Sequence, residues 1–153
     1  MTTRLEHRPR RGGFTLLELL VVLMIMGVVG TFAYPRVTAV TDETALNQAA
    51  AAIRTDLQRA FSEAAKNRRP VRVVITPGDR RYTVTDRATN QVIFTRELGA
   101  EGSGYRIKSL TATVTTFDVF PSGLASSPVT LTIGINDKSR QVTMTRVGLT
   151  QVQ

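Results

Sequence analysis

The chain has 153 residues and a formal net charge of +8 at pH 7, from 20 lysines and arginines against 12 aspartates and glutamates. It contains no cysteine, which excludes a disulfide framework, a thiolate zinc site and a nucleophilic thiol. A chain of this length predicts one domain held together by packing alone, and its basic balance favours a polyanionic partner or surface without indicating a fold.

The first element in chain order is an apolar segment that follows a basic N-terminus. Residues 14–34 are apolar except for Thr15, Glu18 and Thr31. As a helix rising 1.5 Å per residue, this segment is roughly 30 Å long, which is the thickness of the hydrocarbon core of a bilayer. The positive-inside rule keeps the basic N-terminus cytoplasmic and places the rest of the chain across the membrane. The arginines that set this orientation are Arg4, Arg8, Arg10 and Arg11.

Three interpretations of this segment are open. A secretory signal peptide would be cut near Ala33. A generic membrane anchor would leave Glu18 unexplained, because a carboxylate in hydrocarbon costs about 2.5–3.5 kcal/mol unless it has a partner. Cleavage between Gly13 and Phe14 would supply that partner, since the new α-amino group lies four residues before Glu18 on the same helical face. The acid then binds the amine of its own or a neighbouring subunit and guides assembly.

The stretch "RRGG" followed by "FTLLELLVVLMIMGVVG" resembles the class III signal of type IV prepilins and type II secretion pseudopilins. The resemblance implies that a prepilin peptidase cuts after Gly13 and methylates the amine of Phe14, and that Glu18 guides subunit assembly. It also implies a helix that loosens between Gly27 and Pro35 in filaments, in line with the low helix propensity of both residue types. Close packing of membrane helices at the glycines is the alternative.

The second half of the predicted helix is amphipathic. Apolar residues recur there at steps of three and four, and the segment from Asn67 to Pro70 provides a stop. We expect one long helix, anchored in its first half and covering a globular domain with its second half. The apolar face carries Leu46, Ala50, Ile53, Leu57, Phe61 and Ala64. The expected polar side carries Asn47, Arg54, Asp56, Gln58, Glu63 and Lys66.

After Pro70 the hydrophobic period changes from that of a helix to two, which predicts strands joined by short antiparallel hairpins. The fold class expected is α+β and type IV pilin-like, with a long N-terminal helix packed on an antiparallel β-sheet domain. The predicted strands cover residues 71–76, 81–86, 91–96, 105–110, 111–120, 128–135 and 140–146.

The C-terminal part carries a second resemblance. Residues 117–148, "FDVFPSGLASSPVTLTIGINDKSRQVTMTRVG", are similar to the C-terminal half of the GspH/FimT family of minor pseudopilins. The shared pattern is a strand ending in Phe-Pro-Ser-Gly at 120–123, then a hairpin, then Val-Gly at 147–148. The domains expected are a leader (1–13), a transmembrane and assembly helix (14–36), its amphipathic continuation (37–69) and a periplasmic β domain (70–153).

Residues for catalysis are scarce in this chain. His7 is the single histidine and lies in the leader, so the mature chain would lack both His and Cys. We therefore expect no enzyme, no metal site and no cofactor. The acids Asp79, Asp86, Asp118 and Asp137 lie at predicted turns or strand ends, where turn and solvating roles are typical.

Basic residues gather where the helix meets the first strand, at Lys66, Arg68, Arg69 and Arg72. Removal of the leader takes away four basic residues and one acid and leaves +5, so a polyanion patch and ordinary surface charge are both open here. The resemblance to FimT-like minor pilins implies DNA capture through a basic C-terminal tail. Residues 149–153, "LTQVQ", contain no arginine and depart from that pattern.

The function expected is that of a minor pseudopilin of a type II secretion system. Its partners would be prepilin peptidase, other pilins or pseudopilins and the bacterial inner membrane, with the β domain in the periplasm and the assembled protein in a pseudopilus. The alternative is a FimT-like minor pilin of a type IV pilus that primes pilus assembly or binds DNA.

Overall fold

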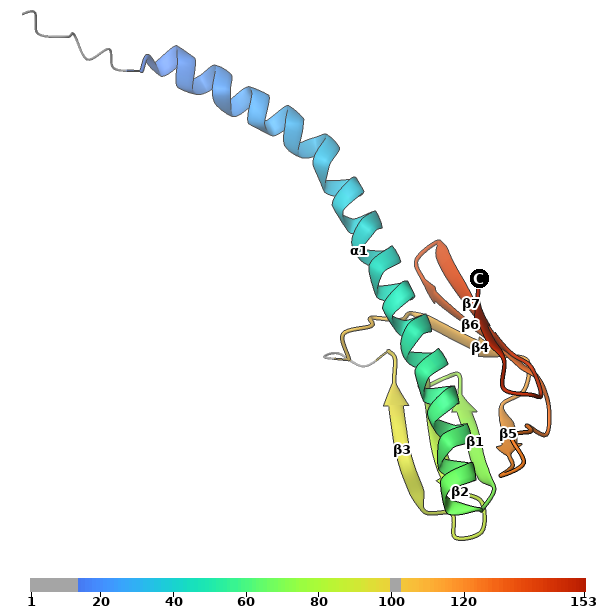
Figure 1. The fold of residues 1–153 in the computed structure, drawn as a ribbon. Coiled ribbons are helices and arrows are strands. Elements are labelled where there is room, and N and C mark those ends of the chain that lie inside the picture. Colours follow the sequence, from blue (N-terminus) through green and yellow to red (C-terminus); the bar gives the residue numbers. More distant parts are fainter. Residues whose placement is uncertain (1–13, 100–102) are drawn as a thin grey trace, which may run out of the picture. The chain divides into compact units, whose positions relative to one another are not determined.

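The computed structural model describes residues 14–99 and 103–153, and for residues 32–39 it describes the backbone alone. The chain divides into two compact units, Met1–Thr38 and Ala39–Gln153. The described elements are one helix, α1, and eight strands, β1 to β8 (Figure 1).

Helix α1 spans Leu16–Asn67. It begins after Thr15, whose side-chain Oγ1 accepts a hydrogen bond from the backbone N–H of Glu18 at 3.2 Å. A threonine that binds the N–H three residues later satisfies one of the free donors at a helix N-terminus, and the Thr-x-x-Glu spacing is that of a capping box.

Helix α1 ends in a Schellman motif. The N–H of Arg68 donates to the carbonyl of Ala65 at 3.4 Å, and the N–H of Arg69 donates to the carbonyl of Ala64 at 3.3 Å. Arg68 takes the left-handed position of the motif, with φ 52°, where glycine is usual. The predicted stop after Asn67 is confirmed.

The strands form two four-stranded antiparallel sheets, one with the order β3-β2-β1-β5 and the other with the order β4-β6-β7-β8. The fold class expected from the sequence is confirmed. The strand bounds are β1 Val71–Thr76, β2 Arg81–Asp86, β3 Val92–Glu97, β4 Ser109–Ala112, β5 Thr116–Val119, β6 Val129–Ile135, β7 Lys138–Met144 and β8 Thr150–Val152.

Three stretches differ from the predicted strands. Residues 105–108 are outside any strand, and the stretch predicted as one strand over 111–120 is divided into the end of β4 and the whole of β5. The chain changes sheets at this point, because the N–H of Thr113 donates to Thr130 of β6 at 3.0 Å whereas the carbonyl of Thr115 accepts from Ile75 of β1 at 2.7 Å. The tail after Gly148, for which no strand was predicted, forms β8.

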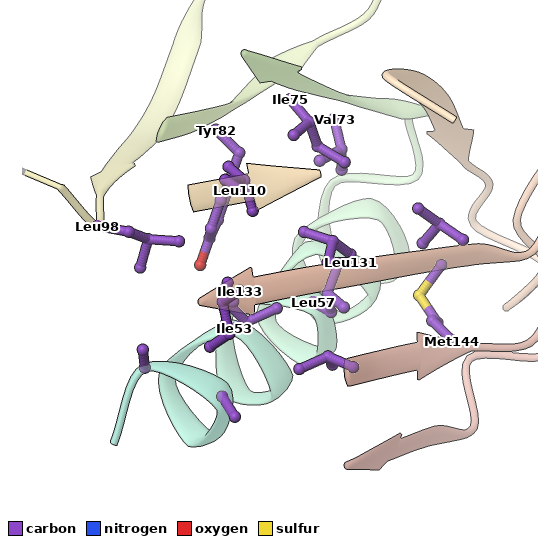
Figure 2. Packing of buried hydrophobic residues seen from close by; sticks show 14 of the residues in the cluster. Ile53, Leu57, Val73, Ile75, Tyr82, Leu98, Leu110, Leu131, Ile133 and Met144 are labelled. Carbon is purple, nitrogen blue, oxygen red and sulfur yellow. The ribbon is translucent and has the colours of Figure 1, made fainter. Parts of the chain in front are cut away.

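The hydrophobic core of the second unit lies between α1 and the two sheets (Figure 2). Four alanines of α1 are fully buried, and such small side chains let a helix approach a sheet closely. The helix adds Leu46, Ile53 and Leu57 to this core, and the sheets add Val73, Ile75, Tyr82, Val84, Phe117, Leu131, Ile133, Val142 and Met144.

Asp56 links α1 to the first sheet and corrects the prediction that it lies on the polar side of the helix. It is 3% exposed. Its Oδ2 accepts hydrogen bonds from the Tyr82 hydroxyl and from Arg96 Nε, both at 2.7 Å, and its Oδ1 accepts from Arg96 Nη2 at 3.1 Å. Burial, together with the nearby Asp56 carboxylate, raises the pKa of Tyr82, so its hydroxyl stays protonated and donates.

The β6–β7 hairpin is linked to an earlier part of α1 by exposed polar contacts. Asn136 Nδ2 donates to Asp42 Oδ2 at 2.8 Å, and Arg140 Nε donates to Asn47 Oδ1 at 3.0 Å. Glu43 forms ion pairs with Arg140 at 3.3 Å and with Lys138 at 3.5 Å. These contacts are exposed to solvent, so each stabilises the fold by little.

Candidate functional site

The first candidate site is the apolar segment at the start of α1. Phe14 is described with its side chain 82% exposed, whereas Gly13, the other half of the predicted cleavage bond, lies outside the described residues. A helix that is apolar on all sides is normally covered by other helices or by lipid. The exposed apolar side chains are Leu16, Leu17, Leu19, Leu20, Val21, Val22, Leu23, Met24, Ile25, Met26, Val28 and Val29.

Over the part of the chain that the structure describes, no helical stretch combines the length and the hydropathy needed to cross a membrane.

Glu18 occupies the third position of α1, within the first turn. A negative charge there is favoured by the partial positive charge of the helix N-terminus. Its backbone N–H is also the donor to Thr15, a capping contact that the sequence analysis missed. The signal was present, since Thr-x-x-Glu before an apolar run is the signature of a capping box. The assembly role of Glu18 stays a prediction.

The predicted loosening of the helix concerns the stretch between Gly27 and Pro35. In the structure α1 is continuous through both residues. A side chain added at Gly27 would meet no atom within 4 Å, so the described fold leaves room for a neighbouring helix there. Thr31 Oγ1 donates to the carbonyl of Gly27 at 2.9 Å, a contact that often bends helices. Loosening within a filament stays a prediction.

The second candidate site is the basic junction, which we define as Lys66, Arg68 and Arg69 at the C-terminal end of α1. All three are exposed, and none forms an ion pair with another described residue. The structure therefore places three exposed positive charges within four residues of chain, on the last turn of the helix and its Schellman motif. One of them, Arg69, interacts electrostatically with the Asp86 carboxylate.

Arg72, the fourth member of the predicted patch, is paired. Its Nε lies 2.8 Å from Asp118 Oδ1 and its Nη2 lies 3.3 Å from Asp118 Oδ2, a two-pronged contact. This hydrogen bonding, with the attraction of the carboxylate, raises the pKa of Arg72. Arg87 also reaches Asp118, at 3.3 Å. One carboxylate thus holds two of the nearby arginines and lowers the charge that they offer to a polyanion.

Two of the acids expected at turns have distinct roles. Asp86 caps the β2–β3 turn, because its Oδ1 accepts the backbone N–H groups of Ala88 at 2.8 Å and Thr89 at 3.0 Å. These hydrogen bonds lower the pKa of Asp86, which confirms its predicted turn role. Asp118 departs from its prediction, because it lies within β5 with its side chain 14% exposed and neutralises arginines. Among the described residues no cluster of three or more His, Cys, Asp or Glu could hold a metal ion.

The arrangement of one helix on antiparallel sheets is shared with solved structures of pilins. The type IV minor pilin FimU of Pseudomonas aeruginosa is 19% identical, with a TM-score of 0.58, over 74% of this chain and 91% of that one. The minor pseudopilin EpsH from the type 2 secretion system of Vibrio cholerae is 20% identical, with a TM-score of 0.56, over 71% of this chain and 95% of that one. These similarities define the fold as type IV pilin-like.

The particular family follows from two family models. The model of the type II transport protein GspH matches residues 49–148, and the prokaryotic N-terminal methylation motif matches residues 8–34. The chain belongs to the GspH family, which comprises structural, envelope-associated pilins and pseudopilins. Its prepilin-type signal implies processing and assembly with other pilins. A comparison with curated proteins found no match.

Proposed function

We propose that this protein is a minor pseudopilin of a type II secretion system. Prepilin peptidase cleaves it between Gly13 and Phe14 and methylates the new amine. In this proposal residues 14–36, which extend past the residues whose side chains the structure describes (14–31), span the inner membrane before assembly, and the β domain is periplasmic. The observation that supports this proposal most directly is the exposure of apolar side chains all round the start of α1, within the residues that match the methylation motif. The protein acts by its place in a filament, and no enzymatic turnover is proposed.

Processing gives the first prediction. Co-expressed with an active prepilin peptidase, the chain should begin at Phe14 and carry one N-terminal methyl group, which mass spectrometry of the intact membrane protein measures. Retention of Met1 beside an active peptidase, or a start near Ala33, would contradict the proposal. The variant Glu18→Ala separates processing from assembly. It should be cleaved and methylated normally, yet it should join filaments poorly if the Glu18 carboxylate guides assembly.

A second function, that of a FimT-like minor pilin that binds DNA in a type IV pilus, is favoured by the basic junction. Its three cations are exposed and free of ion pairs with other described residues, and a helix end that projects such charges can contact successive phosphates. The pairing of Arg72 and Arg87 with Asp118 limits this surface to the junction itself.

The test is a salt titration of DNA binding by the full processed chain in detergent. Lys66→Ala, Arg68→Gly and Arg69→Ala are combined, since glycine suits the left-handed position of Arg68. If the junction contacts phosphates, this variant should bind more weakly, with a salt slope lower by roughly 2–3.

The matched control for this titration removes three exposed cations elsewhere, by Arg106→Gly, Lys108→Ala and Arg146→Ala. Arg106 is also left-handed, with φ 53°, so both variants carry the same kinds of backbone change. Equal loss of binding in the two variants would indicate general charge attraction. Absence of binding near physiological salt would remove the DNA function.

A further inference from the structure

Strand β8 is an outer strand of the second sheet and leaves one edge unpaired. Gln153, which continues this strand, exchanges both backbone hydrogen bonds with Gln141, at 2.8 and 2.9 Å. In an antiparallel ladder, hydrogen-bonded residues alternate with residues whose N–H and C=O groups point the other way. The N–H and C=O groups of Thr150 and Val152 therefore point away from β7. Thr150 is only 6% exposed, so Val152, at 41%, is the residue whose outward groups a partner can reach.

A groove of about 460 Å³ runs between this edge and α1. One side is formed by Val152, which is 41% exposed. The other side is a stripe of α1 residues spaced by three and four positions along the helix. The α1 residues are Asn47, Ala51, Arg54, Thr55 and Gln58.

The uncompensated charge in this groove is positive. Arg54 is exposed and forms no ion pair with another described residue. The amide oxygen of Asn47 accepts a hydrogen bond from Arg140 Nε at 3.0 Å, and the hydroxyl of Thr55 donates to the carbonyl of Ala51 at 3.0 Å. A segment that enters the groove would thus meet one guanidinium without an ion-pair partner, beside the small Ala51, the bonded Thr55 hydroxyl and the amides of Asn47 and Gln58.

We propose that β8 and this groove bind an extended segment of a neighbouring subunit, added as a further strand with an acidic side chain directed at Arg54. Backbone hydrogen bonds to the exposed Val152 supply affinity in this mode, and the side chains of the added strand supply specificity. This proposal rests on the proposed function only in taking the segment from a neighbouring subunit of the same filament. Mass spectrometry of the processed N-terminus tests the proposed function separately, so the failure of one proposal can be told from the failure of the other.

The short length of the edge explains how the free protein avoids aggregation through it. A short edge strand is one of the devices by which proteins prevent unwanted sheet pairing, and β8 has only three residues. The same shortness makes the contact weak for a free peptide. Between subunits already joined through their helices, binding becomes effectively intramolecular, and a weak edge is then filled.

The probes are two synthetic peptides, acetyl-Thr-Val-Glu-Val-Thr-amide and its counterpart with lysine in place of glutamate. Binding to the processed full chain in detergent micelles is followed by ¹⁵N NMR. The acidic peptide should slow hydrogen exchange at the Val152 amide and bind roughly two- to fivefold more tightly than the basic peptide, as for an exposed ion pair. Arg54→Glu should reverse this preference.

Val152→Pro is the sharper variant, because it deletes the outward N–H without removing a hydrogen bond to β7. This variant should bind neither peptide, so the ¹⁵N resonances of Ala51 and Thr55 should not shift when peptide is added. Its melting temperature should be unchanged. Val152→Ala retains the N–H and should still bind. Equal binding by the proline variant, or an unchanged preference in Arg54→Glu, would overturn the proposal. Protection of Val152 that rises with protein concentration alone would overturn it in favour of a second copy.

Discussion

Asp56→Ala should lower the free energy of unfolding by about 3 kcal/mol. The substitution leaves the buried Tyr82 hydroxyl without its acceptor, a loss of about 1–3 kcal/mol, and leaves the Arg96 guanidinium without its partner. Breaking a fully buried ion pair costs about 3–5 kcal/mol, but the Arg96 side chain is 35% exposed and water takes up part of this loss. Urea unfolding of the full chain in detergent measures the change as a lower midpoint at constant slope.

Glu43→Ala is the matched control, because it also removes one carboxylate of α1 that binds cationic residues of a sheet. The Glu43 side chain is 51% exposed, so its ion pairs with Lys138 and Arg140 are screened by solvent. We expect a loss below about 1 kcal/mol. Equal losses in the two variants would show that the buried network around Asp56 does not fix the helix on the sheet.

The error at Asp56 shows what periodicity alone can predict. The spacing of buried residues along α1, such as Ile53, Leu57 and Ala64, was readable in the sequence, and position 56 lies beside that stripe. Its residue type nevertheless assigned Asp56 to the polar side. The partner that makes its burial tolerable, Arg96, lies 40 residues away in a strand, and no local pattern links the two.

The same limit applied to the basic patch. Lys66, Arg68 and Arg69 are neighbours in the chain, so their clustering followed from the sequence. The ion pair of Arg72 with Asp118 could not be predicted in this way, because Asp118 is 46 residues away and is brought near by the β1–β5 pairing.

The change of sheet near Thr113 could not be predicted for another reason. Strands of both sheets have the same hydrophobic period of two and the same β-branched residues, so the sequence pattern does not tell the sheets apart.

Gly148→Ala should lower the free energy of unfolding by about 2–5 kcal/mol, for two separable reasons. Gly148 has φ 79°, a left-handed conformation that costs an L-residue roughly 1–2 kcal/mol. A Cβ there would also lie 3.1 Å from Cζ and 3.2 Å from Cε1 of Phe61, and crowding of this kind costs about 1–3 kcal/mol. Thermal and urea unfolding of the full chain in detergent measure the sum.

Gly123→Ala separates the two contributions, since Gly123 has the same φ of 79° but no atom within 4 Å of its added Cβ. It should lose only the backbone part, about 1–2 kcal/mol. Combining Gly148→Ala with Phe61→Ala should recover the packing part, because the ring that the new methyl group meets is gone. Equal losses in the two glycine variants would show that the Phe61 contact is not limiting. If the Gly148 variant loses more, the Val-Gly pattern at 147–148 has a physical cause: the turn before β8 needs a left-handed residue and lies so close to α1 that an added Cβ would press on the ring of Phe61.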